Sequence, residues 1–531
     1  MRVLSILCAA AVLALFTGLA VAQIGTSTIT GRVTDPTGAV IPGVEVTVVN
    51  VETNFQLTGK TNDEGLYRVP SLQPGPYRLV FQVGGFKRLV REDIRLRTGD
   101  VLAVNVGLEV GNVAESVEIT GAAPLLETET SSVGSVLQGQ TLYTLPMYQR
   151  FVMGAVLFIP GVSAGTSYGS SLSGFSVAGQ RSSAIGAVED GTSVNDPGEG
   201  SAGIKTVQNS VAEVKVLTTV LPAEYGHSGG GMITIVKKTG TNEWHGMASI
   251  YGRSRSMQHR TYHDRERSSQ PTPGNPNGQR NFFLLPDANV GGPILIPKLY
   301  DGRNKSFFFF GYQKLIEKKT NQYFIAVPTP EMEKGDFTFG GVGRAIYDPN
   351  TTRQLADGSW ARDPFSNKLI PLSALDAVAR KVLEIHPWKP PNNPATFGAD
   401  GPASNLSYDE RSRTFFEDFN TRLDHQFNPY VKIYASWTSN HANGWGRPSN
   451  IRLPDWDTGS TKSPSTNQNS SLGLTWVIGP SLVNDVRLGY YRRWSQKMVP
   501  SFMKDYGKIL GIPNISPALL PAFGTGGAGS A

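Results

Sequence analysis

The segment 223–246, AEYGHSGGGMITIVKKTGTNEWHG, joins a glycine-rich turn to an alternating strand and then to a segment that opens with an aromatic residue. The adjacent glycines Gly229, Gly230 and Gly231 indicate close backbone approach, or turns with positive φ where a β-carbon would clash. The alternation from Met232 to Val236 predicts a strand directly after them. A compact unit therefore ends here, immediately before a longer β-rich part of the chain.

Downstream of Glu243 the chain consists of alternating segments rich in aromatic residues, separated by long polar loops. In one segment Phe419 to Phe427 alternate with polar residues, and similar patterns follow at 431–438 and 485–491. Each is close to the ~9 to 11 residues that cross a bilayer as a tilted strand, with apolar side chains outward and polar ones inward. The turn Asn428-Pro429 predicts a hairpin with a short connection between the first two segments.

Residues 1–22 resemble a cleavable secretory signal, with Arg2 before an apolar run and Ala20-Val21-Ala22 as the cleavage site. An N-terminal membrane anchor fits less well, because the apolar run barely reaches spanning length. The single cysteine, Cys8, lies inside this signal, so the mature chain from Gln23 has neither disulfides nor cysteine ligands for a metal. After the signal no apolar run approaches the roughly 20 residues of a transmembrane helix, so insertion into outer-membrane lipid requires a barrel.

The composition favours many strands and turns, with 59 Gly and 35 Pro and only 17% charged residues. The formal net charge is +6, and the basic residues are scattered, which gives a nucleic-acid partner little support. The fold class that we predict is all-β: a small antiparallel β-sandwich, then a second compact domain, then the N-terminal part of a transmembrane antiparallel β-barrel.

Residues 23–110 form the predicted sandwich, with about seven short strands between turns such as Asn62-Asp63-Glu64-Gly65. The sequences GRVTDPTGAVIPGVEVTV and TNDEGLYRVPSLQPGPYRL resemble the carboxypeptidase regulatory-like, transthyretin-related fold. Residues 27–110 contain no histidine, so a zinc-dependent activity has no basis there. A docking domain and a simple spacer both remain open.

Several stretches resemble the Oar-like group of TonB-dependent outer-membrane receptors. They are the glycine-rich run with its following strand, Val290-Gly291-Gly292-Pro293-Ile294, the run Lys305 to Tyr312, and Val327-Pro328-Thr329-Pro330 before Gly335-Asp336-Phe337. The resemblance implies a plug over residues 111–242 and a barrel over residues 243–531. It also implies a TonB-type energy-coupling protein and an extracellular ligand, of unknown identity, as partners.

Within the implied plug, Glu115, Ser116, Val117, Glu118, Ile119 and Thr120 stand where such receptors keep the TonB box, a segment that adds as a strand to a partner's sheet edge. An ordinary first strand is the alternative. Asp190 and Gly191 are expected in a tight turn, and Asn195 begins a loop. The family has an apolar residue where this chain has Glu189. Arg181, Asp190 and Glu224 are candidate polar ties that hold the plug, and Gly229, Gly230 and Gly231 would pack against the barrel wall.

No catalytic motif is present, so we predict that the protein is not an enzyme and needs no cofactor. His259 and His263 have i, i+4 spacing, but they lie in a Ser-, Arg- and Pro-rich stretch where a helix is not expected, so no metal is predicted. The expected function is TonB-energised passage of a large ligand through a plugged barrel in the outer membrane of a Gram-negative bacterium, with a periplasmic sandwich. The alternative is a barrel-anchored surface binding or adhesion protein whose sandwich recognises carbohydrate or protein.

The barrel portion offers about seven candidate strands, whereas plugged outer-membrane transporters close with about 22. Because barrel diameter grows with strand number, about seven strands cannot surround the plug implied for residues 111–242. The expectation from sequence is therefore that this chain is a fragment or a truncated reading frame.

Overall fold

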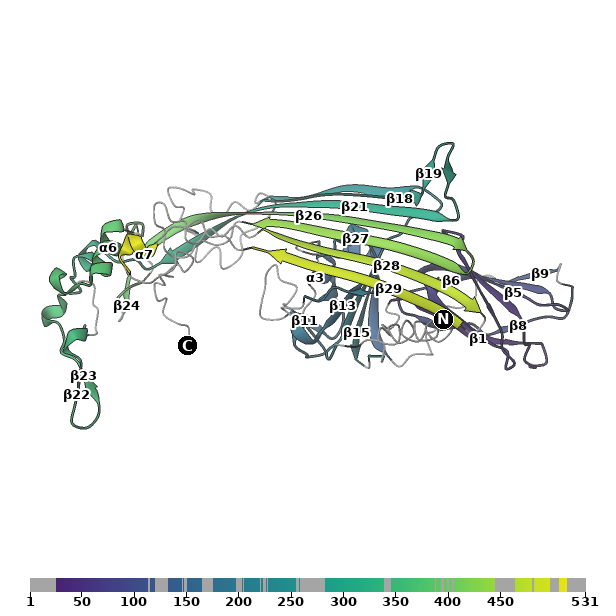
Figure 1. Cartoon of the computed structure of the whole chain (residues 1–531), viewed down its shortest axis with the longest axis horizontal. Coiled ribbons are helices and arrows are strands. Elements are labelled where there is room, and N and C mark those ends of the chain that lie inside the picture. Colours follow the sequence, from purple (N-terminus) through teal and green to yellow (C-terminus); the bar gives the residue numbers. More distant parts are fainter. Residues whose placement is uncertain are drawn as a thin grey trace, which may run out of the picture.

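A computed structural model describes the chain as three β-rich parts: a sandwich at one end, a long curved sheet, and a second domain beneath that sheet (Figure 1). The described residues are 25–112, 115–119, 132–145, 147, 150–164, 175–196, 203, 205–219, 221–222, 226, 228–254, 257, 282–338, 345–386, 388–392, 396–398, 401–403, 405–444, 464–479, 482–496 and 506–512. The predicted signal at 1–22 and the pair His259 and His263 lie outside them.

The first part, here called the sandwich domain, consists of two sheets packed face to face, which confirms the predicted sandwich. One sheet has the order β4-β1-β7, with β8 also paired to β1, and the other has the order β3-β2-β5-β6-β9. Its strands are β1 (Ser27–Thr34), β2 (Glu45–Asn50), β3 (Gln56–Lys60), β4 (Leu66–Leu72), β5 (Gly75–Gln82), β6 (Arg88–Leu96), β7 (Val101–Ala103), β8 (Val106–Gly107) and β9 (Ser116–Ile119). Its core includes the fully buried Ile29, Leu79 and Phe81.

Most neighbouring strands of the sandwich domain are antiparallel, as predicted, but three pairs at its edges are parallel. These are β1 with β7, β1 with β8, and β6 with β9. The last pair lies beyond the predicted end of the sandwich at residue 110, so the sheet recruits a strand from the segment expected to begin the plug.

The second part, the central domain, is built on the five-stranded sheet β10-β15-β16-β13-β14. Its strands are β10 (Val133–Gln138), β11 (Val162–Ala164), β12 (Phe175–Val177), β13 (Gly186–Glu189), β14 (Thr192–Ser193), β15 (Val211–Thr219) and β16 (Met232–Lys237). Short helices α2 (Gly139–Thr144) and α3 (Val152–Val156) and the 3-10 turns η1 (Ser182–Ala184) and η2 (Gln208–Ser210) complete it. Its core, with Leu142, Ile233 and Ile235 almost fully enclosed, is separate from that of the sandwich domain.

The third part is a seven-stranded antiparallel sheet in which strands neighbouring along the chain are also neighbours in space, in the order β17-β18-β21-β26-β27-β28-β29. Its strands are β17 (His245–Ser254), β18 (Phe282–Pro293), β21 (Ser306–Ile325), β26 (Leu406–Asn428), β27 (Val431–Gly444), β28 (Ser465–Gly479) and β29 (Leu482–Ser495). The seven strands match the number expected from the alternating segments. The sheet curves over the central domain (Figure 1).

The alternation of β26 and β27 has the predicted orientation. On β26 the side chains of Asn420, Arg422 and Asp424 are at most 3% exposed, whereas Leu423 is 45% exposed and Phe427 60%. Because successive side chains of a strand point to opposite faces, one face of the sheet is polar and covered by the central domain, and the other is apolar. The face that contacts the central domain is called the inner face below.

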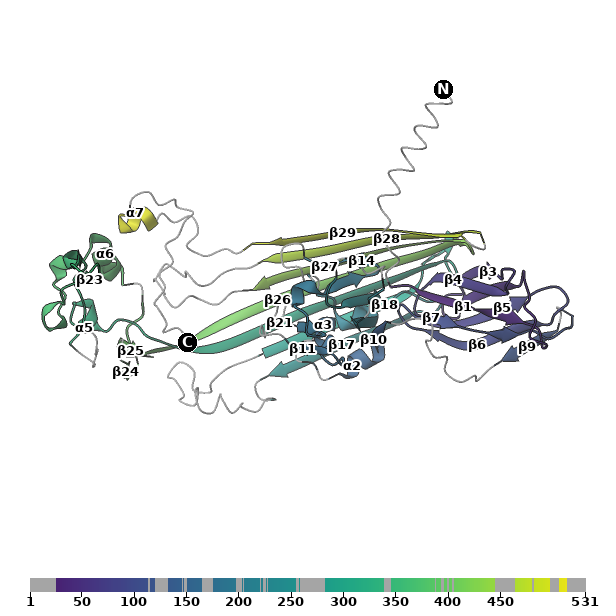
Figure 2. The same ribbon diagram turned by 90° about the horizontal axis from the view of Figure 1, so that it is seen from below.

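The two ends of the seven-stranded sheet differ in the length of their connections (Figure 2). At the end beside the sandwich domain the connection from β26 to β27 is short, as predicted, but it spans Pro429 and Tyr430 and not Asn428 and Pro429. The hairpin β19 (Leu295–Ile296) and β20 (Tyr300–Asp301) also lies at this end. At the opposite end the connection from β21 to β26 is long.

That long connection contains α5 (Pro330–Glu333), α6 (Ala377–Ile385), the 3-10 turns η5 (Pro349–Thr351), η6 (Ser366–Lys368) and η7 (Leu372–Ala374), and the strands β22 (Arg353–Gln354), β23 (Trp360–Ala361), β24 (Thr396–Gly398) and β25 (Gly401–Ala403). Helix α7 (Tyr506–Leu510) packs against α6 through Leu510. None of the helices in the described ranges has the length and hydropathy that crossing a membrane requires.

Candidate functional site

The hairpin between β13 and β14 presses its tip against the inner face of the seven-stranded sheet. Asp190 and Gly191 occupy its two central positions with φ of 48° and 81°, the left-handed pair of a type I′ turn, which confirms the predicted tight turn. A β-carbon added at Gly191 would lie 2.0 Å from Nη1 of Arg487 on β29. Glycine therefore serves both the backbone conformation and the close approach to the sheet.

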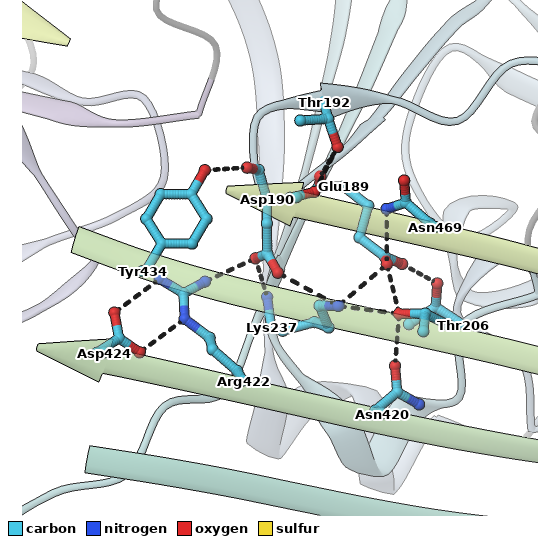
Figure 3. A network of polar contacts seen from close by, with 12 residues as sticks. Glu189, Asp190, Thr192, Thr206, Lys237, Asn420, Arg422, Asp424, Tyr434 and Asn469 are labelled. Atoms are coloured by element: carbon cyan, nitrogen blue, oxygen red, sulfur yellow. Dashed lines mark hydrogen bonds and ion pairs between the residues drawn. The ribbon is translucent and has the colours of Figure 1, made fainter. Parts of the chain in front are cut away.

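The Asp190 carboxylate forms the centre of a buried ionic network between the central domain and the seven-stranded sheet (Figure 3). Nη1 of Arg422 donates to Asp190 Oδ1 at 2.8 Å, and the backbone N–H of Lys237 donates to the same oxygen at 3.0 Å. Nζ of Lys237 lies 3.4 Å from Asp190 Oδ2. The phenol of Tyr434 donates to the backbone carbonyl of Asp190 at 2.6 Å.

Glu189, the last residue of β13, extends the network and is completely buried. Its Oε1 lies 3.3 Å from Nζ of Lys237 and accepts a hydrogen bond from Oγ1 of Thr438 at 2.7 Å. Its Oε2 accepts a hydrogen bond from the hydroxyl of Thr206 in the central domain. The polar residue at the family's apolar position therefore has a defined set of partners, in both the central domain and the sheet.

Residues on the sheet fix the orientation of the groups that reach the central domain. Nε of Arg422 donates to Asp424 Oδ2 at 2.9 Å, so the guanidinium is held between two carboxylates. Asn420 donates to Asp418, the next inward-facing residue on β26, and its Oδ1 lies 2.9 Å from Oγ1 of Thr438. This support makes the inner face a preformed receiving surface for the hairpin tip.

The charge of Asp190 is stabilised although the residue is buried. Burial by itself raises the pKa of a carboxyl group, because desolvation disfavours the charged form. The nearby Arg422 and Lys237 charges, together with the backbone hydrogen bond from Lys237, outweigh burial and leave the pKa of Asp190 below its ordinary value of 3.8. Asp190 is therefore ionised at neutral pH and forms true ion pairs.

A second polar contact lies beyond β16. Burial lowers the pKa of Lys238 to about 8, and the neighbouring Asp287 on β18 opposes that shift. Nζ of Lys238 donates to the hydroxyl of Tyr143 at 2.5 Å, and burial raises the pKa of Tyr143 to about 12.

Further polar contacts surround the hairpin tip. Asp196 forms an ion pair with Arg493 of β29, and Nδ2 of Asn467 on β28 donates to the carbonyl of Gly203 at 3.0 Å. The backbone N–H of Lys205 donates to Oδ1 of Asn440 at 2.9 Å. The contacts named around the hairpin tip are hydrogen bonds and ion pairs, whereas elsewhere Phe151 and Val207 of the central domain pack in an apolar cluster with sheet residues such as Phe416.

A polar contact of this kind can form and separate without leaving large apolar surfaces in water. Removing one partner of a buried ion pair strongly destabilises a protein, because the other charge stays buried without compensation. Separating both partners into water restores the hydration of each. The site thus has the chemistry of a removable seat. No group of three or more potential metal ligands occurs in the described parts of the chain.

The structure places the predicted plug residues in different environments. Asn195 stabilises the strand before the turn, because its Oδ1 accepts from the Ala187 N–H at 2.8 Å and its Nδ2 donates to the Ile185 carbonyl at 3.3 Å. Arg181 is exposed, so its interpretation as an internal tie is wrong. Glu224 lies outside the described residues.

The three glycines also differ from their prediction. A β-carbon on Gly230 would lie 2.4 Å from Cβ of Gln180, and one on Gly231 2.6 Å from Cγ1 of Val177. The nearest atom to one on Gly229 belongs to Ala184, at 4.0 Å. These neighbours belong to the central domain, so the expected packing of the glycines against the barrel wall is wrong. Close approach at Gly230 and Gly231 is real, but it occurs inside the domain.

The box-like segment is a strand of the sandwich domain. Ser116 to Ile119 form β9, which pairs in parallel with β6, and the carbonyl of Glu115 accepts from the Arg88 N–H at 2.9 Å. Thr120 lies outside the described residues. Its assignment as a contact for an energy-coupling protein remains a prediction.

Sequence reasoning missed most of the network. Glu189 was noted only as a departure from the family turn, Arg422 and Tyr434 lie in predicted alternating segments, and Lys237 follows the predicted strand from Met232 to Val236. The available signal was a run of charged and amide residues, Asn420, Arg422 and Asp424, at inward positions of one strand. Such residues need partners when buried.

Comparison with known proteins identifies the family. The family model described as outer membrane beta barrel domain matches residues 236–530, and the one described as carboxypeptidase regulatory-like domain matches residues 28–109. The chain belongs to the outer membrane beta-barrel family. It is homologous to the TonB-dependent transporter Oar of Myxococcus xanthus, with 32% identity over 302 residues, 54% of this chain and 26% of that protein.

Similar solved structures include two outer-membrane proteins. A ferric enterobactin receptor of Pseudomonas aeruginosa aligns over 68% of this chain and 41% of its own, with a TM-score of 0.37 and 12% identity. The outer membrane transporter YddB of Escherichia coli aligns over 68% of this chain and 39% of its own, with a TM-score of 0.39 and 9% identity. The chain spans about a quarter of the length of Oar and about two fifths of these two structures.

Proposed function

We propose that this chain acts in a TonB-energised outer-membrane receptor, in which the central domain is a plug and its displacement lets a large ligand pass. The observation that carries the proposal is the buried ionic seat of Asp190 between Arg422 and Lys237. A plug has to be held in one position and yet be removable, and polar contacts between preformed surfaces meet both needs.

The box-like segment 115–120 is our candidate contact for the energy-coupling protein. Strand addition needs an extended segment with backbone groups free to pair. In the described residues β9 is an edge strand, so one of its sides faces no other strand. The side chains of Glu115, Ser116 and Glu118 in this segment are exposed.

The lengths of the connections support a periplasmic position for the sandwich domain. Outer-membrane barrels have short periplasmic turns and longer extracellular loops. The sandwich domain lies at the end with the short turn between β26 and β27, and the long connection from β21 to β26 lies at the other end (Figure 2).

An adhesion function finds less support. Recognition of a glycan by the sandwich domain would call for exposed aromatic side chains, but Tyr67, Tyr77 and Phe81 are at most 4% exposed. The aromatic ring of Phe55 packs against Phe307 of β21. The name of the homologous protein Oar, a transporter, favours transport over both adhesion and catalysis.

Capture of an energy-coupling protein tests the proposal. The full gene product, solubilised in detergent micelles, would be incubated with the immobilised periplasmic domain of a TonB-type protein from the same bacterium. Because proline removes a backbone donor, Ile119→Pro is expected to lower retention by about tenfold. Ile119→Val, which keeps the N–H, is the matched control. Equal retention of all three proteins would refute the assignment of the box.

A further inference from the structure

The sandwich domain contacts the central domain through the turn that follows β6. The backbone N–H and the hydroxyl of Thr98 both donate to Oε2 of Glu213 on β15, at 2.7 and 2.9 Å. Nζ of Lys215, two residues along the same strand, donates to the carbonyl of Gly99 at 3.0 Å. Thr98 is fully buried, and Glu213 and Lys215 are each 6% exposed, so these bonds are shielded from water.

The same domain is also anchored to the end of the seven-stranded sheet. The ring of Phe55, next to β3, stacks edge to face on Phe307 of β21 with 5.2 Å between centroids. Nε2 of Gln426 on β26 donates to the carbonyl of Gln56 at 2.8 Å. The backbone N–H of Asn242 donates to the carbonyl of Glu52 at 3.0 Å. The sandwich domain is therefore held in a fixed place relative to both the sheet and the central domain.

β6 leads into the turn that contacts Glu213, and β6 is also the strand that pairs with β9. Strand β6 runs from Arg88 to Leu96, and the turn that binds Glu213 begins one residue later. β9 lies parallel to β6 in continuous register, from Arg88 opposite Ser116 to Arg91 opposite Ile119. Val117 packs against the sandwich core, and Nζ of Lys87 lies 3.5 Å from the Glu115 carboxylate.

These contacts join three elements in mechanical series: β9, then β6 with its turn, then β15. A pull along the axis of β9 loads all its hydrogen bonds to β6 together, because the two strands are parallel and in register. The load then reaches a turn whose buried bonds end on a central strand of the five-stranded sheet. Coupling between distant sites is carried by such chains of rigid elements and hydrogen bonds.

We propose that the carboxypeptidase regulatory-like sandwich is a force relay, which transmits a pull on residues 115–119 through β6 and the Thr98–Glu213 contact to the plug strand β15. This inference rests on the proposed function, since an energy-coupling protein supplies the pull. It assigns the sandwich domain a role in opening, distinct from that of a spacer. The covalent connection from β9 to β10 is the competing route.

A cysteine on the buried hairpin of β13 and β14 distinguishes the relay through β6 from the covalent connection between β9 and β10. Thr192, which is 6% exposed, is replaced by cysteine in the full gene product, where Cys8 lies in the predicted signal. Labelling by an aqueous maleimide in energised cells then reports displacement of the hairpin. The relay is weakened by Thr98→Val with Lys215→Met, which removes the hydroxyl and ammonium bonds and keeps the side-chain bulk.

The relay predicts that this double variant lowers energy-dependent labelling by about tenfold while capture by the TonB-type domain is unchanged. Thr58→Val with Lys60→Met, on the far edge strand β3, is the matched control and is expected to label like the parent. Lys215→Arg keeps a donor for the Gly99 carbonyl, and is expected to restore most labelling when Thr98 is intact.

Two results would overturn the relay. Labelling of the double variant equal to that of the control would assign the pull to the covalent connection. Increased labelling without energy would show that the contact only restrains the plug. If the TonB-type domain did not capture the parent protein, the proposed function would be contradicted. Capture and maleimide labelling are measured separately, so the two failures can be distinguished.

Discussion

At the scale of single residues, the seat of the central domain depends on the charge of Asp190 more than on its shape. Asparagine also tolerates the left-handed backbone of this turn position, so Asp190→Asn removes the charge and keeps the hairpin. The variant leaves the Arg422 guanidinium with Asp424 and the Lys237 ammonium with Glu189. We expect a loss of about 2 kcal/mol in the free energy of unfolding at neutral pH.

The pH dependence of that loss follows from the lowered pKa of Asp190. A carboxyl group with a lowered pKa in the folded state contributes stability above its unfolded pKa, and that stability disappears as the pH falls through the folded pKa. The parent and variant should therefore converge only below pH 3.8. Urea titrations of tryptophan fluorescence in detergent micelles would measure this, with Asp63→Asn, in an exposed turn, as the control. A constant difference across the whole pH range would exclude a role for the charge.

At the scale of elements, the hairpin of β13 and β14 fits the wall because β29 has a glycine beside it. A β-carbon on Gly489 would lie 2.6 Å from Cβ of Thr192, a distance that forces either the hairpin or the strand to move. Overpacking of this kind costs about 1 to 3 kcal/mol, so Gly489→Ala should lower the free energy of unfolding by that amount. Gly479→Ala is the matched control, because a β-carbon there meets no atom within 4 Å. Equal losses in the two variants would mean that strand propensity, and not the contact, decides the effect.

The elements also mark the boundary between what the sequence predicts and what it does not. The Asp190-Gly191 turn and the inward side of β26 were predicted because each depends on neighbours within a few residues. The ion pair of Asp190 with Arg422 joins residues 232 positions apart, and no local pattern selects that pair. Close approach was correctly predicted for Gly230 and Gly231 but not for Gly229, and the partner surface was wrong, since a β-carbon clash does not specify which neighbour causes it.

At the scale of the whole molecule, the arrangement makes a prediction about sidedness. The sandwich domain and the β22–β23 hairpin lie at opposite ends of the seven-stranded sheet (Figure 1). If the sheet spans the outer membrane in the proposed direction, Ser359 in the hairpin turn faces the medium and Asp63 in the sandwich turn faces the periplasm. Both side chains are exposed, so accessibility within the protein does not distinguish them.

Single cysteine variants, Ser359→Cys and Asp63→Cys, would be treated with a maleimide too large to cross the outer membrane. We expect labelling of Ser359→Cys in intact cells, and labelling of Asp63→Cys only after the outer membrane is permeabilised. The exposure of both sites makes the ratio of labelling before and after permeabilisation a direct measure of topology. Labelling of Asp63→Cys in intact cells would place the sandwich domain outside. In that position a periplasmic protein could not reach β9, so both the assignment of the box and the force relay would fail together.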